Sequence, residues 1–123
     1  MEGLRVAHKY GAKKVTVDGI TFDSKAESIY YQLHKDEPNM KMQEKFILQD
    51  KFRLGGKGYR EIYYKPDFTF YDEEDNLIKV VDVKGMILPE FKIKAKMFAA
   101  RYGLPITIAK KVARKDEFVE EVI

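Results

Sequence analysis

Apolar side chains recur along this chain with two different periods, and the change of period divides it into helical and extended segments. Helical spacing is found at the apolar positions Ala26, Ile29, Tyr30 and Leu33. Ser24 and Glu27 have the S-x-x-E form of a capping box, and Pro38 disfavours helix at the residue before it. We therefore predict a first helix over residues 25–35.

The middle of the chain is rich in Ile, Val, Phe and Tyr, which favour strands. Three strands are predicted, over residues 45–52, 59–71 and 77–84. The glycines at 55–58 and the polar run 72–76 are typical of the turns between them. We expect these three segments to form an antiparallel meander.

Helical spacing returns after the meander. The positions on its apolar stripe are Phe91, Ala95, Phe98 and Tyr102. Gly103 is suited to end such a helix, so the sequence predicts a second helix over residues 90–102. A strand over residues 106–109 and a short, weakly specified helix over residues 114–122 are expected to follow.

The amino-terminal part is polar and basic, with a short apolar alternation around the turn signal Asp18-Gly19. This pattern predicts an arm that ends in a small hairpin. The predicted organisation is a single domain with an arm at 1–22, a core at 23–113 and a tail at 114–123.

Composition limits the class of protein. A chain of 123 residues can bury one core, and no apolar run approaches the length of a membrane span. Cysteine is absent and no signal-peptide pattern opens the chain, so we expect an intracellular, cytoplasmic protein. The net charge of +3 permits nucleic-acid binding, and basic residues gather at 9–14, 51–60 and 92–96.

Two aspartates in the meander are expected to face each other. If Asp72 faces Leu77 across the turn, counting back along both strands puts Asp67 directly opposite Asp82. Like charges at opposed positions are destabilising, so a cation should lie between them. Mg²⁺ or Mn²⁺ meets this need, because hard cations prefer carboxylate and carbonyl oxygens.

A lysine joins this pair. Lys84 lies two residues after Asp82, so both side chains project from the same face of the strand. An ammonium group there could orient an attacking water and offset charge on a phosphorane-like transition state. Pro66 cannot donate a ladder hydrogen bond, which suggests an edge or a bulge beside Asp67.

Pro66-Asp67-Phe68 and Asp82-Val83-Lys84 resemble the two motifs of the PD-(D/E)xK nuclease superfamily. Residues 10–110 as a whole resemble a family of small phage-encoded proteins in that superfamily, related to Holliday junction resolvases. The resemblance implies an α/β (α+β) fold with a restriction-endonuclease-like αβββαβ core, a mixed central sheet flanked by helices. It also implies two metal-binding aspartates, a water-positioning lysine and a first-helix glutamate that matches Glu27.

The resulting hypothesis is a Mg²⁺-dependent endonuclease that hydrolyses DNA phosphodiesters and acts on branched DNA as a homodimer in the cytoplasm, with no membrane partner. Its catalytic residues would be Glu27, Asp67, Asp82 and Lys84. Asp67, Asp82, Glu27 and the carbonyl of Val83 would hold one or two metal ions. The residues expected to contact DNA are Lys13, Lys14, Lys57, Arg60, Lys94 and Lys96.

Plainer interpretations stay open at this point. Glu27 could serve only as a capping residue, the two aspartates could be surface residues, and Lys84 could form an ordinary salt bridge. The lysines of the second helix could simply flank an apolar face. Two other functions are also open: a DNA-binding module without catalysis, and a sequence-specific nuclease.

Overall fold

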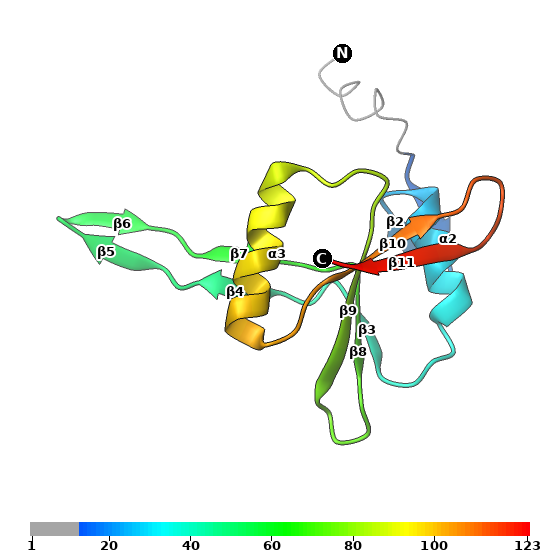
Figure 1. The fold of residues 1–123 in the computed structure, drawn as a ribbon, viewed down its shortest axis with the longest axis horizontal. Helices are drawn as coiled ribbons and strands as arrows, with labels where there is room; N and C mark the ends of the chain where they lie inside the picture. Colours follow the sequence, from blue (N-terminus) through cyan, green and yellow to red (C-terminus); the bar gives the residue numbers. More distant parts are fainter. Residues whose placement is uncertain (1–12) are drawn as a thin grey trace, which may run out of the picture.

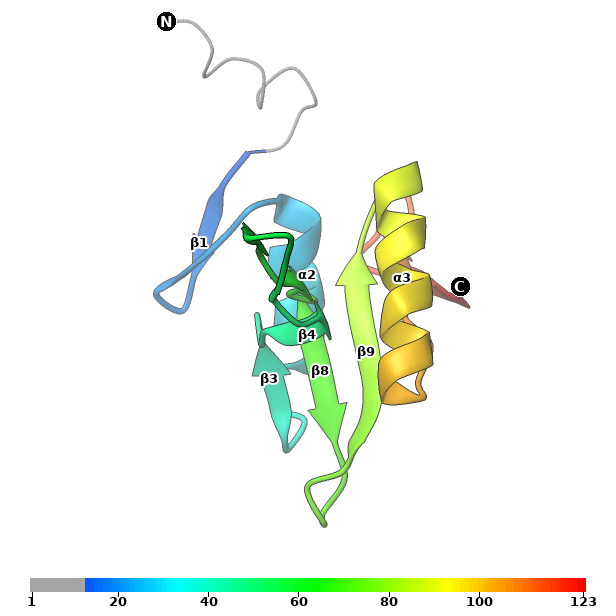
Figure 2. The ribbon, with the colours of Figure 1, turned by 90° about the vertical axis from the view of Figure 1, so that its left-hand side faces the viewer.

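The computed structural model describes residues 13–123, and the earlier part of the predicted arm lies outside them. Its centre is a five-stranded mixed sheet with the order β11-β10-β9-β8-β3 (Figure 1). The bounds are β3 Met40–Met42, β8 Phe68–Tyr71, β9 Leu77–Val83, β10 Thr107–Lys111 and β11 Phe118–Val122. Strand β10 runs parallel to β9, and the other neighbouring strands are antiparallel. Figure 2 shows β3, β8 and β9 side by side.

Helices α2 (Lys25–His34) and α3 (Pro89–Tyr102) pack on opposite faces of this sheet. The α3 face contains Val80 in one buried cluster, whereas the α2 face contains Val81 in the other. Neighbouring strand residues point to opposite faces, which explains how β9 serves both clusters. The fold is therefore mixed α+β, with two helices enclosing a mixed sheet.

The predicted ends of both helices are confirmed by their caps. In α2, the Ser24 hydroxyl oxygen accepts a hydrogen bond from the backbone N–H of Glu27 at 3.1 Å. In α3, Gly103 adopts a left-handed conformation with φ 70° and donates its N–H to the carbonyl of Ala99. At the other end of α3, Leu88 occupies the N-cap position without a side-chain hydrogen bond, and Pro89 occupies a position where its missing N–H costs nothing.

The predicted hairpin near the amino terminus is also present, with β1 (Val15–Val17) paired to β2 (Ile20–Phe22). Asp18 and Gly19 form its turn with φ values of 53° and 76°. Two positive φ values in a two-residue turn match the right-handed twist of the strands, and Asp-Gly tolerates them.

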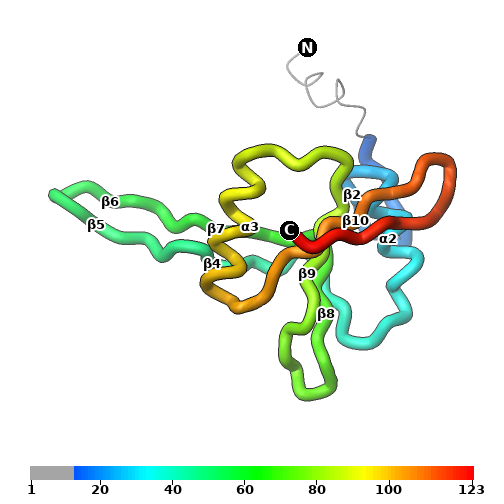
Figure 3. The backbone as a smooth tube through the Cα atoms, viewed as in Figure 1, coloured from blue at the N-terminus to red at the C-terminus, as the bar shows by residue number. Residues whose placement is uncertain are grey.

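The three predicted segments pair antiparallel in the predicted order, 45–52 with 59–71 and 59–71 with 77–84, but they do not form one sheet. Strands β4 (Phe46–Gln49) and β7 (Ile62–Tyr64) pair with each other outside the central sheet, and so do β5 (Phe52–Leu54) and β6 (Lys57–Tyr59). Together they form a long ribbon that extends away from the body of the protein (Figures 1 and 3). The expected single strand over residues 59–71 is broken between β7 and β8, where Pro66 is buried and cannot donate a ladder bond.

On its other edge β8 pairs with β3, which the sequence did not predict. This strand has only three residues, and Asn39 and Gln43 on either side of it have positive φ values of 63° and 55°. A strand this short leaves no visible alternation. With β3 included, the sheet strands and helices follow in the order α2, β3, β8, β9, α3, β10, and β11 is added at the end.

The predicted helix over residues 114–122 is also wrong, because the tail forms β11 along the edge of β10. Phe118 packs edge-on against Tyr30, with ring centroids 5.1 Å apart. Glu120 accepts a hydrogen bond from the Tyr30 hydroxyl at 3.0 Å and pairs with Lys79 at 2.6 Å. Pairing with an open sheet edge outweighs a weak local helix preference. Within residues 13–123, neither helix has the length and apolar character needed to cross a membrane.

The packing of α3 gives a direct stability test. Phe98 is 0% exposed at the centre of the α3 cluster, whereas Ile93 on the same helix is 61% exposed. We expect Phe98→Ala to lower the free energy of unfolding by about 3–5 kcal/mol, through lost burial and a residual cavity. Ile93→Ala should change it by less than about 0.5 kcal/mol. Urea denaturation of both variants measures the difference, and equal effects would contradict the assigned face of α3.

Candidate active site

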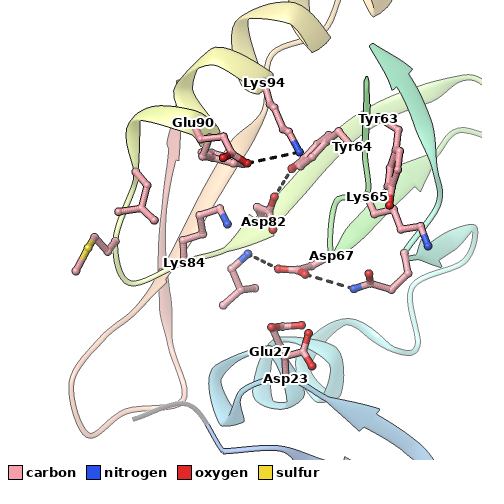
Figure 4. Close-up of a pocket in the computed structure, with 15 residues that line it drawn as sticks. Asp23, Glu27, Tyr63, Tyr64, Lys65, Asp67, Asp82, Lys84, Glu90 and Lys94 are labelled. Atoms are coloured by element: carbon pink, nitrogen blue, oxygen red, sulfur yellow. Dashed lines mark hydrogen bonds and ion pairs between the residues drawn. The ribbon is translucent and has the colours of Figure 1, made fainter. Parts of the chain in front are cut away.

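The four residues predicted to be catalytic line one pocket of about 530 Å³ at an end of the sheet (Figure 4). Asp67 directly precedes β8, Asp82 is near the carboxyl end of β9, and Lys84 follows β9. Glu27 comes from the first turn of α2 and points toward Asp67. The structure therefore brings together residues that are up to 57 positions apart, from Glu27 to Lys84.

The predicted register of the two aspartates is reached by an unexpected route. Tyr71, rather than Asp72, faces Leu77, so the turn between the two strands is one residue longer than predicted. A bulge at Ile78 then restores the predicted register, and Phe68 faces Val81. Asp67 and Asp82 continue these two strands toward the pocket, where the charge of Asp67 acts on Asp82.

Asp82 is a buried carboxyl group, only 5% exposed, so the surface interpretation is wrong for this residue. The hydroxyl of Tyr64 donates a hydrogen bond to its Oδ2. Burial raises the pKa of Tyr64 far above its ordinary value, so this hydroxyl keeps its proton and remains a donor. Tyr64 thus holds the carboxyl group in place with a neutral donor and does not cancel its charge.

Asp67 is fixed by backbone and side-chain amides. Its Oδ2 accepts the N–H of Val83 at 2.8 Å, and its Oδ1 accepts the side-chain amide of Gln43 at 3.4 Å. The backbone N–H of Gln43 also donates to the carbonyl of Asp67 at 3.4 Å. The bond to Val83 ties the start of β8 to the end of β9, where Asp82 lies.

Glu27 takes part in the cap of α2 through its backbone N–H and also lines the pocket with its side chain, so the capping interpretation does not exclude a place in the site. The Ser24 hydroxyl lies 3.5 Å from Glu27 Oε1. Asp23, which the sequence did not single out, lies beside Glu27 in the pocket (Figure 4).

Burial shifts the acidic groups of the pocket toward their protonated forms. Burial raises the pKa of Asp82 to about 8, and the nearby charge of Asp67 adds to the shift. Burial also raises the pKa of Asp67 to about 6, although a hydrogen bond with Asp82 acts in the opposite direction. The pKa of Glu27 is raised by burial and then by the charge of Asp23. These groups therefore repel one another when all are ionised.

Three lysines, Lys65, Lys84 and Lys94, contribute positive charge to the pocket. Lys84 Nζ lies 4.4 Å from the centre of the Phe91 ring, a cation–π contact that holds it at the wall. Within residues 13–123 it makes no ion pair under 4.0 Å with either aspartate, so the simple salt-bridge interpretation is not supported. Lys94 lies further along α3 and pairs with Glu90 at 3.8 Å.

The other residues predicted to contact DNA are spread over the surface. Lys94 is at the pocket, but Lys96 lines a different hollow, beside Ile87 and Ile123. Lys57 and Arg60 are exposed on the ribbon, and Lys13 and Lys14 are exposed before β1. The structure therefore brings Lys94 to the predicted site, but not Lys96, Lys57 or Arg60.

The buried charge gives a test of stability that needs no substrate. Burial gives the Asp82 carboxyl group a higher pKa in the folded state than in the unfolded state. The free energy of unfolding of the protein therefore falls as the pH rises from about 4 toward about 8, because the folded state disfavours ionisation of this group. We expect Asp82→Asn, in the absence of divalent ions, to raise the free energy of unfolding at pH 8 by on the order of 2 kcal/mol. The gain should be much smaller at pH 5. Urea denaturation at both pH values measures it.

Glu74→Gln is the matched control, because Glu74 is exposed in the β8–β9 turn. It should leave stability within about 0.5 kcal/mol at both pH values. If Asp82→Asn made the protein less stable than the parent at pH 8, the ionised Asp82 carboxylate would not be destabilising the folded state.

Comparisons with known proteins support the fold more than any activity. The crystal structure of SSO0001 is similar with a TM-score of 0.51 and 15% sequence identity, a likeness that shows the fold alone. The alignment covers 79% of this chain and 47% of that one, so this chain spans about half the length of SSO0001. No curated protein matches. A family model described as a protein of unknown function, DUF1064, matches residues 7–115, and the chain therefore belongs to the DUF1064 family.

Proposed function

We propose that this protein is a metal-dependent endonuclease of the PD-(D/E)xK type, which hydrolyses DNA phosphodiesters and acts on branched DNA. The observation that supports this most is the gathering of Glu27, Asp67 and Asp82 with Lys84 in one pocket. Carboxylates with raised pKa values in a cleft mark candidate functional sites. The mixed sheet with a helix on each face is compatible with a restriction-endonuclease-like core.

The donor set suits Mg²⁺. Within residues 13–123, no three His, Cys, Asp or Glu side chains stand in a ready-made metal cluster. Mg²⁺ does not need one, since it is commonly held by one or two carboxylates together with water and substrate phosphate. Asp67 and Asp82 supply two adjacent carboxyl groups whose mutual repulsion a cation would relieve. In the proposal they hold Mg²⁺, or Mn²⁺ in its place, with the Val83 carbonyl and Glu27 completing the set.

In the proposed reaction, the residues of the pocket have separate roles. When bound, the metal ion stabilises the negative charge that builds on the scissile phosphate and the leaving oxygen. Lys84 orients the attacking water from the wall formed by Phe91. Tyr64 and the Val83 N–H hold the two aspartates in fixed positions, which limits the reorganisation needed during reaction. In-line attack of water on phosphorus then leaves a free 3′-hydroxyl on the departing strand.

The proposed substrate is large, so contacts outside the pocket belong to the proposal. Lys94 at the pocket, Lys13 and Lys14 before β1, and Lys57 and Arg60 on the ribbon would bind phosphates. The position of Lys96 in another hollow makes it the weakest member of this set. Symmetric cutting of two strands at a junction would require a two-fold dimer, which sedimentation at assay concentration tests.

Cleavage of labelled four-way junction, flap and linear duplex DNA with Mg²⁺ or Mn²⁺ tests the proposal. We expect metal-dependent cutting of the branched substrates. Asp82→Asn should reduce the rate by about 10²-fold or more, because the site loses one of its charged oxygens. Lys84→Ala should also reduce it by about 10²-fold, without changing DNA affinity to the same extent.

Glu74→Gln and Lys92→Ala are the controls for these substitutions, since both parent side chains are exposed away from the pocket. Mg²⁺ should also raise the melting temperature of the parent protein at pH 8 and leave that of Asp82→Asn unchanged. If the folded protein binds DNA but cuts none of the substrates, the endonuclease proposal is wrong and a DNA-binding module without catalysis is the better interpretation.

The ribbon offers a separate prediction about affinity. Lys57 and Arg60 lie on its exposed part, and Lys57 is 5.2 Å from the centre of the Tyr59 ring. Replacing both residues with Ala should weaken duplex binding and lower the slope of log affinity against log salt by about one unit per lost phosphate contact. The Mg²⁺-induced rise in melting temperature should not change. An unchanged salt slope would remove the ribbon from the DNA-binding surface.

A further inference from the structure

We call the pocket lined by Glu27, Asp67, Asp82 and Lys84 the carboxylate pocket. A second hollow, of about 640 Å³, lies next to it and has the opposite charge. Every charged residue in its lining is a lysine: Lys13, Lys25, Lys84, Lys110 and Lys111. The carboxylate pocket, by contrast, is lined by five acidic residues, Asp23, Glu27, Asp67, Asp82 and Glu90, and by three lysines, Lys65, Lys84 and Lys94, so acidic residues are in excess there. We call the second hollow the lysine hollow.

The sheet topology explains why these lysines meet. Because β9 and β10 are parallel, their carboxyl ends lie at the same end of the sheet, and Ala109 is the partner of Val83. The backbone N–H of Lys84 continues the contact by donating to the carbonyl of Ala109 at 3.1 Å. Lys110 and Lys111 follow Ala109 directly, so β10 delivers them beside Lys84.

Direct ion pairs within residues 13–123 do not cancel the positive charge of the lysine hollow. None of Lys13, Lys25 and Lys110 forms an ion pair there with an acidic side chain within 4.0 Å. Lys111 Nζ donates to the neutral carbonyl of Val112 at 3.2 Å. An anion bound in the hollow would therefore relieve repulsion among several ammonium groups.

The two hollows share one wall, formed by Val83 and Lys84. The first turn of α2 separates them as well, since Glu27 lines the carboxylate pocket and Lys25 and Ala26 line the lysine hollow. A nucleic-acid strand carries a phosphate at every nucleotide, so a strand that crosses this wall presents a phosphate to each side.

We propose that the lysine hollow binds the backbone phosphate that neighbours the scissile one. This inference rests on the proposed function, and it adds a direction to the substrate: the strand passes from the carboxylate pocket over Lys84 toward Lys110 and Lys111. The hollow would thereby position the scissile phosphate without contacting a base, so its contribution is independent of sequence.

Binding of a fluorescently labelled single-stranded oligonucleotide, measured by anisotropy without divalent ions, tests the subsite apart from catalysis. Lys110→Glu should weaken binding about tenfold or more at about 0.1 M salt and reduce the salt slope. Lys92→Glu is the matched control, because it changes the net charge equally from an exposed position outside both hollows. Circular dichroism and melting temperature establish that both variants fold. Equal weakening by the two variants would overturn the proposal.

A second experiment identifies which backbone phosphate the lysine hollow binds. Single phosphates near the branch point of a four-way junction are replaced one at a time by neutral methylphosphonate. One neighbouring position should weaken binding to the parent protein but have little further effect on Lys110→Glu. The absence of any such position would refute the subsite, whereas a clear position without cutting would refute only the nuclease proposal. Inorganic phosphate that binds as tightly as the oligonucleotide would identify the hollow as a site for free phosphate and overturn the strand assignment.

Discussion

The register of β9 between β8 and β10 is the constraint on which the candidate site depends. Alternate residues of β9 enter two different cores, with Val80 packed toward α3 and Val81 toward α2. A slip of one residue would exchange these faces and move Asp82 away from Tyr64. The hydrophobic packing of the whole domain therefore holds a carboxyl group where burial disfavours its charge. The carboxylate pocket and the lysine hollow both follow from where β9 and β10 end.

The polar contacts around the aspartates fix their geometry more than they cancel their charge. A carboxylate can accept about four hydrogen bonds. In the described residues, Asp82 receives a donor from Tyr64, and Asp67 receives donors from Val83 and Gln43. All three donors are neutral groups. Without a cation nearby, burial favours the protonated form of both groups, so the negative charge that the proposed metal site needs would be established when a cation binds.

The sequence predicted features that depend on local chemistry and missed those that depend on distant pairing. Capping at Ser24 and Gly103 located both helices, and strand alternation placed Asp82 and Lys84 on one face. The opposition of Asp67 and Asp82 was predicted from a turn of the wrong length, and the bulge at Ile78 compensates for that error. Turn length and bulges depend on packing across the sheet, which numbering along the chain does not contain.

Strand β3 and the tail strand β11 were missed for a related reason, because each is defined mainly by the neighbour it pairs with. The same holds for the supporting residues of the site. Tyr64 and Gln43 belong to segments whose sequence gives no sign of their contact with an aspartate. Such contacts become visible only when the chain path is known, whereas a motif of charged residues is visible in the sequence itself.

The opposite charges on the two sides of the Val83–Lys84 wall constrain how a DNA strand could bind. Acidic groups in the carboxylate pocket repel a phosphate, and a bound divalent ion would reverse that repulsion. Metal ion and DNA would then favour each other's binding, and thermodynamic linkage makes this coupling equal in both directions. The lysine hollow would attract DNA without a metal ion, because its charge does not depend on one. A strand could therefore be held beside the pocket before the metal ion arrives, and the scissile phosphate would enter only when the charge there has been neutralised.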